Sequence, residues 1–170
     1  MKFKTNYLVI PAITVVIALL GSHFTGLGMD WYDQTLTLPA LTPPKWAFPL
    51  AWTIIYICTA ISAIILWNKG QESKRILWFF RRENMSSSYW WIIGLFIANV
   101  VLNIAWTVIF FGLHQIFAAS IEILILELSI LALLYLTWSK SKSASLLLLP
   151  YAIWVGFASY LTWQILLLNT

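Results

Sequence analysis

The chain has 170 residues, of which 61% are hydrophobic and only 9% are charged. About a quarter of the residues in soluble globular domains are charged, so this composition excludes a soluble globule and indicates a protein of the lipid bilayer. Ten Lys and Arg against six Asp and Glu give a formal net charge of +4, but in a membrane protein the side on which the cations lie is more informative than their sum. Nucleic-acid binding is therefore not expected. The single cysteine, Cys58, lies within an apolar segment, which favours a buried inert thiol.

The first apolar run covers residues 6–28 and follows Lys2 and Lys4. Secretory signal peptides also begin with a basic stretch, but this run is long and lacks an Ala-x-Ala-like cleavage site, so a retained first span is expected. Glycines at positions 21, 26 and 28 are expected to loosen the helix, which should end near Gly28. Residues 29–45 should then form a polar loop that folds back, with a short interfacial helix at residues 32–36.

The second span is expected over residues 46–67, about the 20 residues that roughly 30 Å of hydrocarbon requires. Pro43 and Pro44 fix φ and withhold two amide donors, so a helix can begin after them but cannot pass through them. Residues 68–70, Asn-Lys-Gly, are expected to end this span. The next segment, residues 69–88, holds five cations around the short apolar run 76–80, which predicts an amphipathic patch on the membrane surface.

Three further spans are expected at residues 89–111, 116–138 and 146–168. The sequence thus predicts an all-α integral membrane protein, a single domain made of a five-helix transmembrane bundle. Nine cations fall on the side of the N-terminus and Lys45 alone falls on the other, which predicts an inside N-terminus and an outside C-terminus. Gly94 and Ala98 have a small-xxx-small spacing that permits close helix contact, so a homodimer through the third span is predicted.

Aromatic and polar side chains repeat along single faces of three predicted spans, at spacings of three and four residues. These residues are Trp52 and Tyr56 in the second span, Asn103, Trp106 and Phe110 in the third, and Trp154, Phe157 and Ala158 in the fifth. Such faces would line one interior cavity that suits a large, flat, largely apolar ligand. The alternative is that the rings only fill the bundle, as other tryptophans at span ends form the interfacial belts.

Glu122 and Glu127 are the acidic residues of the fourth span. Five residues apart, they lie about 140° apart around a helix, so they cannot form a carboxylate pair on one face. A structural hydrogen bond to Ser or Asn is expected for each, with a proton or cation relay as the alternative. His23 and His114 lie near span ends with no Cys or His at ligand spacing, so no metal site is expected. The sequence contains no conventional catalytic constellation.

Five motifs succeed one another along nearly the whole chain. They are Trp31-Tyr32 with Pro39 after it, Pro43-Pro44-x-Trp46, Trp52 with Tyr56, Leu102-Asn103-x-Ala105-Trp106, and Pro150-Tyr151-x-x-Trp154-x-x-Phe157-Ala158. Their order and spacing resemble the translocator protein family, also called the tryptophan-rich sensory proteins and, in animals, the peripheral benzodiazepine receptor. The resemblance implies a five-helix bundle, usually a homodimer, in a membrane that is here expected to be a bacterial cytoplasmic one. It also implies an interior pocket for porphyrins, such as protoporphyrin IX and haem, and for synthetic isoquinoline carboxamides.

The resemblance further implies which residues form the site. The pocket would be lined at Trp52, Asn103, Trp106, Trp154 and Ala158, and the loop with Trp31 and Tyr32 would cover it. Trp46, Tyr56, Phe110 and Phe157 complete the set of expected ligand-binding residues.

The function implied is a membrane sensor or regulator of tetrapyrrole and stress metabolism, with porphyrin as ligand and no required cofactor. Two alternatives remain open. One is a light-dependent porphyrin-degrading enzyme that acts through Trp52 and Trp154, because an indole stacked on a photosensitiser can donate an electron. The other is a carrier of tetrapyrroles or sterols, which the absence of visible repeats disfavours.

The chain departs from the family pattern at two places. The family loop usually has Lys-Pro-Ser-Trp before its double proline, whereas residues 38–41 here are Leu-Pro-Ala-Leu, so one lid tryptophan and one cation are missing. The fifth span also lacks the cation that completes the animal sterol motif after Tyr160. Sterol binding by that route is therefore not expected.

Overall fold

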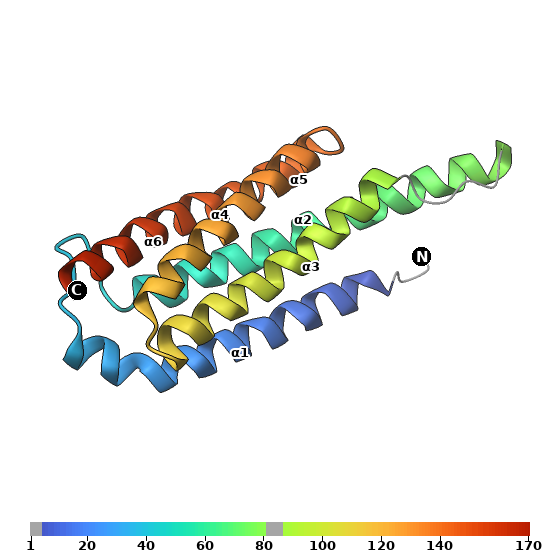
Figure 1. Cartoon of the computed structure of the whole chain (residues 1–170). Helices are drawn as coiled ribbons and strands as arrows, with labels where there is room; N and C mark the ends of the chain where they lie inside the picture. Colours follow the sequence, from blue (N-terminus) through green and yellow to red (C-terminus); the bar gives the residue numbers. More distant parts are fainter. Residues whose placement is uncertain (1–4, 81–86) are drawn as a thin grey trace.

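The computed structural model describes residues 5–80 and 87–170, with side chains described for residues 5–70 and 89–170. Each regular element in this part of the chain is helical. The elements are α1 (Asn6–Thr35), α2 (Ala47–Phe80), α3 (Ser87–Thr107), the π-helix η1 (Val108–Gly112), α4 (Ile116–Trp138), α5 (Lys142–Leu146) and α6 (Leu149–Leu168). Five helical stretches of these residues are long and apolar enough to cross a membrane, α5 and α6 together forming the fifth. The predicted all-α fold with five spans is confirmed (Figure 1).

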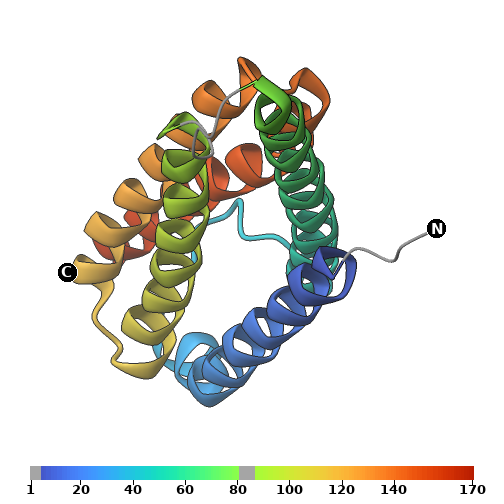
Figure 2. The ribbon, with the colours of Figure 1, turned by 90° about the vertical axis from the view of Figure 1, so that its right-hand side faces the viewer.

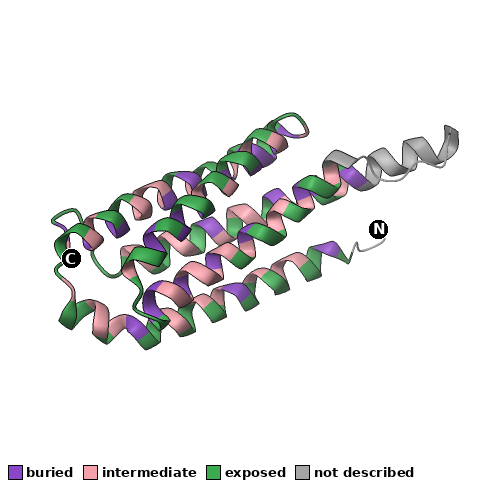
Figure 3. Ribbon diagram, viewed as in Figure 1, coloured by how far each residue is buried: buried purple, intermediate pink, exposed green. Residues whose placement is uncertain are grey.

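The spans run along a common direction and surround one axis, and the segment that joins α1 to α2 crosses one end of the bundle (Figure 2). Helix α4 packs chiefly on α6 and α3, whereas α1 lies at the periphery. In the most apolar 18-residue stretch of α1, 6% of the residues are buried inside the protein, whereas in the corresponding stretch of α4 the share is 39%. Figure 3 shows this contrast. The principal contact of α1 with the bundle is its crossing of η1.

Two apolar clusters hold the central helices together. The first contains Ile55, Ile123, Leu126, Ile130, Tyr151, Ala152 and Val155, from α2, α4 and α6. The second contains Leu66, Ile92, Leu133, Ala144 and Leu148, where α2, α3, α4 and the α5 region meet. Beside the second cluster, the Ser62 hydroxyl donates a buried hydrogen bond of 2.7 Å to the Ala144 carbonyl oxygen. Because lipid tails are as apolar as these side chains, close packing and buried hydrogen bonds of this kind decide where each helix sits.

Helix α1 is longer than the sequence predicts. It continues to Thr35, so Trp31 and Tyr32 lie in its last turns, and no separate interfacial helix exists at residues 32–36. The glycines do not end it, because a helix in lipid must keep its backbone hydrogen bonds internal and one glycine costs only about 1 kcal/mol. The backbone becomes extended at Leu36 (φ −91°, ψ 137°), shortly before Pro39. The lid therefore comprises residues 36–46, a shorter segment than the predicted 29–45.

Helix α2 begins as expected after the double proline, with the Ala47 amide donating to the Pro44 carbonyl oxygen, but it runs past its predicted end. Residues 68–70 do not stop it, and it continues to Phe80. Gly70 stays helical and leaves room for Tyr89, whose ring would lie 3.2 Å from a Cβ at this position. The surface patch predicted at residues 76–80 falls on this extension, and its side chains lie outside the described residues.

The remaining spans lie close to their predicted positions, with two irregularities. The third changes to a π-helix at Val108 before the chain turns toward α4. The fifth begins earlier than predicted, with α5, and is interrupted before α6, which carries Pro150 in its first turn. The Lys69 ammonium donates to the Lys140 carbonyl oxygen over 3.3 Å, so these two predicted inside cations lie at one end of the bundle. The orientation of the termini across the membrane stays a prediction.

Glu122 does not make the hydrogen bond that the sequence predicts. Its side chain is 8% exposed, and neither carboxylate oxygen has a hydrogen-bond partner among the described residues. The Oε2 atom of Glu127 also has no partner in this part of the chain. Both carboxylates therefore destabilise the folded protein, because a buried polar group without a partner loses its hydration and forms no hydrogen bond to compensate.

Gly28 is where α1 comes closest to η1. A Cβ at this position would lie 2.7 Å from the Phe111 Cα and closer still to its carbonyl oxygen. Gly28→Ala should push α1 away from η1 and lower the unfolding temperature in detergent by about 5 °C, because overpacking costs about 1–3 kcal/mol. Gly26→Ala is the matched control, since no atom lies within 4 Å of a Cβ there. Equal unfolding temperatures for the two variants would contradict this contact.

The orphaned carboxylate gives a second stability prediction. Glu122→Met keeps a side chain of similar length and removes two unpartnered oxygens. We expect this change to raise the free energy of unfolding by roughly 1–3 kcal/mol and the unfolding temperature by about 2–6 °C. Glu127→Met, which removes fewer orphaned atoms, should give a smaller rise. A lower unfolding temperature for Glu122→Met would show that the carboxylate has a stabilising partner.

Candidate ligand-binding cavity

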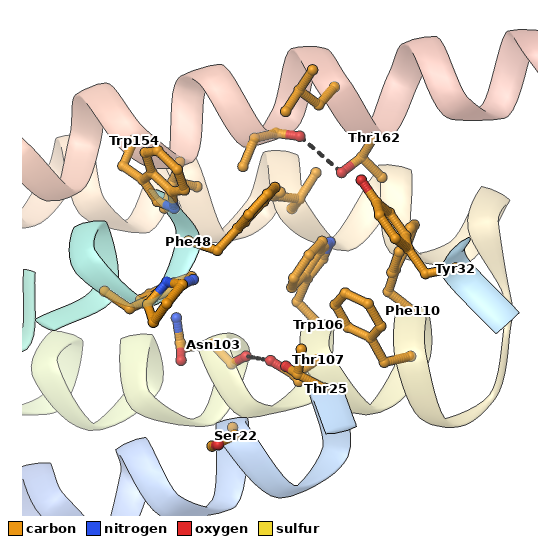
Figure 4. A pocket seen from close by; sticks show the side chains of 18 of the residues that line it. Ser22, Thr25, Tyr32, Phe48, Asn103, Trp106, Thr107, Phe110, Trp154 and Thr162 are labelled. Atoms are coloured by element: carbon orange, nitrogen blue, oxygen red, sulfur yellow. Dashed lines mark hydrogen bonds between the residues drawn. The ribbon is translucent and has the colours of Figure 1, made fainter. Parts of the chain in front are cut away.

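An internal cavity of about 460 Å³ lies near the end of the bundle that carries the lid. Its volume falls within the roughly 300–1,000 Å³ that is usual for small-molecule sites. Side chains from α1, the lid, α2, α3, η1, α4 and α6 line it, and most of its surface is apolar. Figure 4 shows labelled rings from several of these elements pointing into a common space.

Eight of the predicted ligand-binding residues line this cavity. They are Tyr32, Trp52, Tyr56, Asn103, Trp106, Phe110, Trp154 and Ala158. They come from α1, α2, α3, η1 and α6, so the tertiary fold brings together faces that are far apart in the sequence. In particular, Trp52 and Trp154 both face the interior of the bundle.

Three predicted residues lie outside the cavity lining. The Trp31 ring stacks on the His114 ring, with centroids 4.2 Å apart, and meets Phe110 edge-on. Trp46 is 67% exposed just before α2, and Phe157 contacts the Trp154 ring at a centroid distance of 6.0 Å. Trp31 and Phe157 therefore support residues of the wall, whereas Trp46 faces outward.

Stacked rings form much of the wall. The Trp106 ring stacks on Phe110, with centroids 5.2 Å apart and 12° between the planes. On α2, the Trp52 ring stacks on Tyr56 at 5.6 Å. Phe111, the residue after Phe110 in the π-helix, packs edge-on against both Phe110 and Trp106. Because each ring is held by its neighbours, the flat faces are set before a ligand arrives, which lowers the entropy cost of binding.

Several polar groups of the wall are hydrogen-bonded within the protein. Asn103 is buried, and its side-chain amide donates a hydrogen bond of 3.2 Å to the Tyr151 hydroxyl. Thr107 and Thr162 donate to backbone carbonyl oxygens of their own chain segments (Figure 4). The indole N–H of Trp106 is buried and has no acceptor among the described residues, and Figure 4 shows it directed toward the enclosed space. An unsatisfied buried donor costs about 1–3 kcal/mol, and a ligand acceptor can recover this cost if the Trp106 ring shifts to expose its N–H.

Helix α1 contributes a wall that the sequence reasoning missed. Its lining residues before Tyr32 are Ala18, Gly21, Ser22, Thr25, Gly26 and Met29. They recur every three or four positions, so this stripe of small and hydroxyl-bearing residues was readable as one helical face. This face was not predicted as a cavity wall, because the glycines were expected to loosen the end of the helix.

Phe48, Thr53 and Lys45 also line the cavity without having been predicted as site residues. The Phe48 ring meets Trp154 edge-on at 5.8 Å, so the start of α2 is in contact with the first half of α6. Lys45 is the only charged residue among the described residues that line the cavity. The described residues also contain no group of His, Cys, Asp and Glu that could hold a metal ion. The site therefore offers aromatic faces, several polar side chains and one cation.

Comparison with known proteins gives a consistent result. Residues 9–168 match the model of the TspO/MBR family. The chain is 34% identical over 161 residues to the tryptophan-rich protein TspO of Chlorobaculum tepidum, covering 92% of this chain and 91% of that protein. It is 32% identical over 139 residues to the protein CrtK of Rhodobacter capsulatus (82% and 78% covered) and 26% identical over 166 residues to the translocator protein of Homo sapiens (91% and 89% covered). The matched range includes every residue that lines the cavity, and the chain belongs to the TspO/MBR family of integral membrane proteins.

Proposed function

We propose that this protein is a membrane sensor or regulator that binds a porphyrin, such as protoporphyrin IX or haem, in the aromatic cavity. The observation that carries the proposal is the wall itself, in which stacked rings line a space of about 460 Å³ and Trp106, one of these rings, has a buried indole N–H without an acceptor among the described residues. A macrocycle offers a wide π surface to such rings, and its polar substituents offer acceptors. Membership in a family of membrane sensors and translocators supports a role that depends on a ligand.

Light-dependent degradation and transport are separate hypotheses about the fate of the ligand after it has bound. Each requires that the tetrapyrrole first enters the cavity, so binding is the step common to all three functions. We base the proposal on that step. Trp52 and Trp154, which the degradation hypothesis would use, both line the cavity.

We also propose a homodimer in a bacterial cytoplasmic membrane, with the N-terminus inside. Gly94 and Ala98 are exposed on α3, and a Cβ at Gly94 would meet no atom within 4 Å. Ile97 and Val101 nearby are 62% and 60% exposed, so an open apolar face surrounds the small residues. Such a face allows a second α3 to approach closely.

Titration of the purified protein with protoporphyrin IX tests the binding proposal. We expect saturable quenching of tryptophan fluorescence. Trp106→Phe keeps the ring stack and removes the N–H, so it should weaken binding by about fivefold to tenfold, the effect of one hydrogen bond. Trp91→Phe, at a position that is 70% exposed on α3, is the matched control and should bind like the unchanged protein.

Two outcomes would count against this interpretation of the site. Quenching that does not saturate would contradict porphyrin binding altogether. Equal affinities of the Trp106→Phe and Trp91→Phe variants would show that the indole N–H does not contact the ligand.

The dimer is tested separately. Gly94→Leu should fill the open face of α3 and shift the detergent-solubilised protein toward monomer in light-scattering measurements, because close backbone approach is lost. Ile153→Phe, at a position of α6 that is 71% exposed, is a control for a bulky change on another outer face. A dimer fraction that Gly94→Leu leaves unchanged would mean that the copies associate through a different surface.

A further inference from the structure

Lys45 lies at the mouth of the cavity and is paired with an acid. It comes directly after the double proline of the lid, and its ammonium group forms an ion pair with the Asp33 carboxylate in the last turn of α1. The Lys45 side chain is 75% exposed and the Asp33 side chain is 26% exposed. Lys45 lines the cavity and Asp33 does not, so the pair joins the cavity wall to a residue outside it.

This ion pair is easy to exchange. Ion pairs between exposed side chains contribute little net stability, because water and salt screen the charges and both side chains lose freedom. An anion arriving from the cavity can therefore replace Asp33 beside Lys45 at small cost. Asp33 in its present position opposes such an anion by charge repulsion.

The other end of the lid is held differently. The Thr37 amide donates to the Asn169 side-chain oxygen over 2.8 Å, and the Asn169 side-chain amide donates to the Thr37 carbonyl oxygen over 3.0 Å. Asn169 also donates to the Ile165 carbonyl oxygen, which ties this end of the lid to α6. These bonds are neutral and do not involve the cavity. They keep the lid in place while the charge partner of Lys45 changes.

No other described residue of the cavity wall carries a charge that could receive an anion. A ligand that fills the apolar interior and carries a carboxylate has one favourable position for it, beside Lys45. We propose that Lys45 recognises an anionic group of the ligand by exchanging Asp33 for it, so that the cavity selects flat apolar acids over their neutral analogues. This inference rests on the proposed porphyrin site and adds the chemical class that the site prefers.

Protoporphyrin IX, which carries two carboxylic acid groups, and its dimethyl ester are suitable probes, because they share one macrocycle and differ in charge. Binding of each is measured by tryptophan quenching in a nonionic detergent. Lys45→Met should weaken binding of the acid by about threefold to fivefold, the range set by exposed ion pairs, and leave the ester unchanged. Asp33→Asn should strengthen binding of the acid by a similar factor and also leave the ester unchanged. Added salt should weaken binding of the acid alone.

The rival explanation is that the ion pair only latches the lid to α1. Both substitutions break the latch, so under that explanation they would change the affinity in the same direction, and equally for acid and ester. That result, or an acid that binds equally well to all three proteins, would overturn the proposal for Lys45 and leave the cavity as a porphyrin site. If neither probe shows saturable binding to the unchanged protein, the proposed function itself fails.

Discussion

The close approach of α1 to the π-helix is the contact on which the cavity depends. In a bilayer, a peripheral helix gains little by leaving lipid for protein, so α1 needs a place where backbones can touch. Gly28 supplies that place by lying directly against the Phe111 backbone. One turn later, Tyr32 reaches the Phe111 ring at a centroid distance of 5.8 Å, and the lid leaves α1 from this fixed point. A displaced α1 would remove one wall of the cavity and the anchor of its cover together.

The π-helix has a second role in the same region. Phe110 and Phe111 are adjacent in sequence and both buried, and both rings contact Tyr32 and Trp106. Both line the cavity, but Phe110 stacks on Trp106, whereas the backbone of Phe111 is what Gly28 of α1 approaches. Irregular helical turns of this kind often occur at functional sites, because they redirect side chains that a regular helix would place elsewhere.

The buried polar groups of the bundle fall into two classes, those with a hydrogen-bond partner within the protein and those without one. Asn103 and Tyr151 satisfy each other, and the buried hydroxyls of Ser62 and Thr107 donate to backbone carbonyl oxygens, so these groups stabilise the bundle. The Trp106 N–H has no partner among the described residues, and the Trp106 side chain lines the cavity, so a ligand acceptor could meet this donor after a shift of the ring. The Glu122 carboxylate has no partner in the same part of the chain either, but it does not line the cavity. An unpaired group is therefore evidence for a ligand where a ligand can reach it, and elsewhere it is a cost to the fold.

The lid differs from the family pattern in the residues before its double proline. The lysine and tryptophan that the family loop usually has before its double proline are absent here. Lys45, directly after the prolines, places a cation at the cavity mouth, and the Asn169 hydrogen bonds hold the other end of the lid. The neutral hydrogen bonds of Asn169 are therefore the polar contacts that fix the lid to the end of α6.

The sequence by itself determined the number and approximate position of the spans, because lipid requires long apolar helices and because periodicity is a local property. It also identified the aromatic faces of α2, α3 and α6, since Trp52 and Tyr56, for example, are one helical turn apart. It placed the ends of α1 and α2 wrongly, because a glycine breaks a helix only where no packing or lipid environment holds the backbone. The tertiary structure alone decided that α1 completes the cavity, that Trp31 and Phe157 stand behind its wall, and that Lys45 and Asp33 meet at its mouth. These contacts depend on how separate helices approach each other, and the spacing of residues along one helix gives no information about that approach.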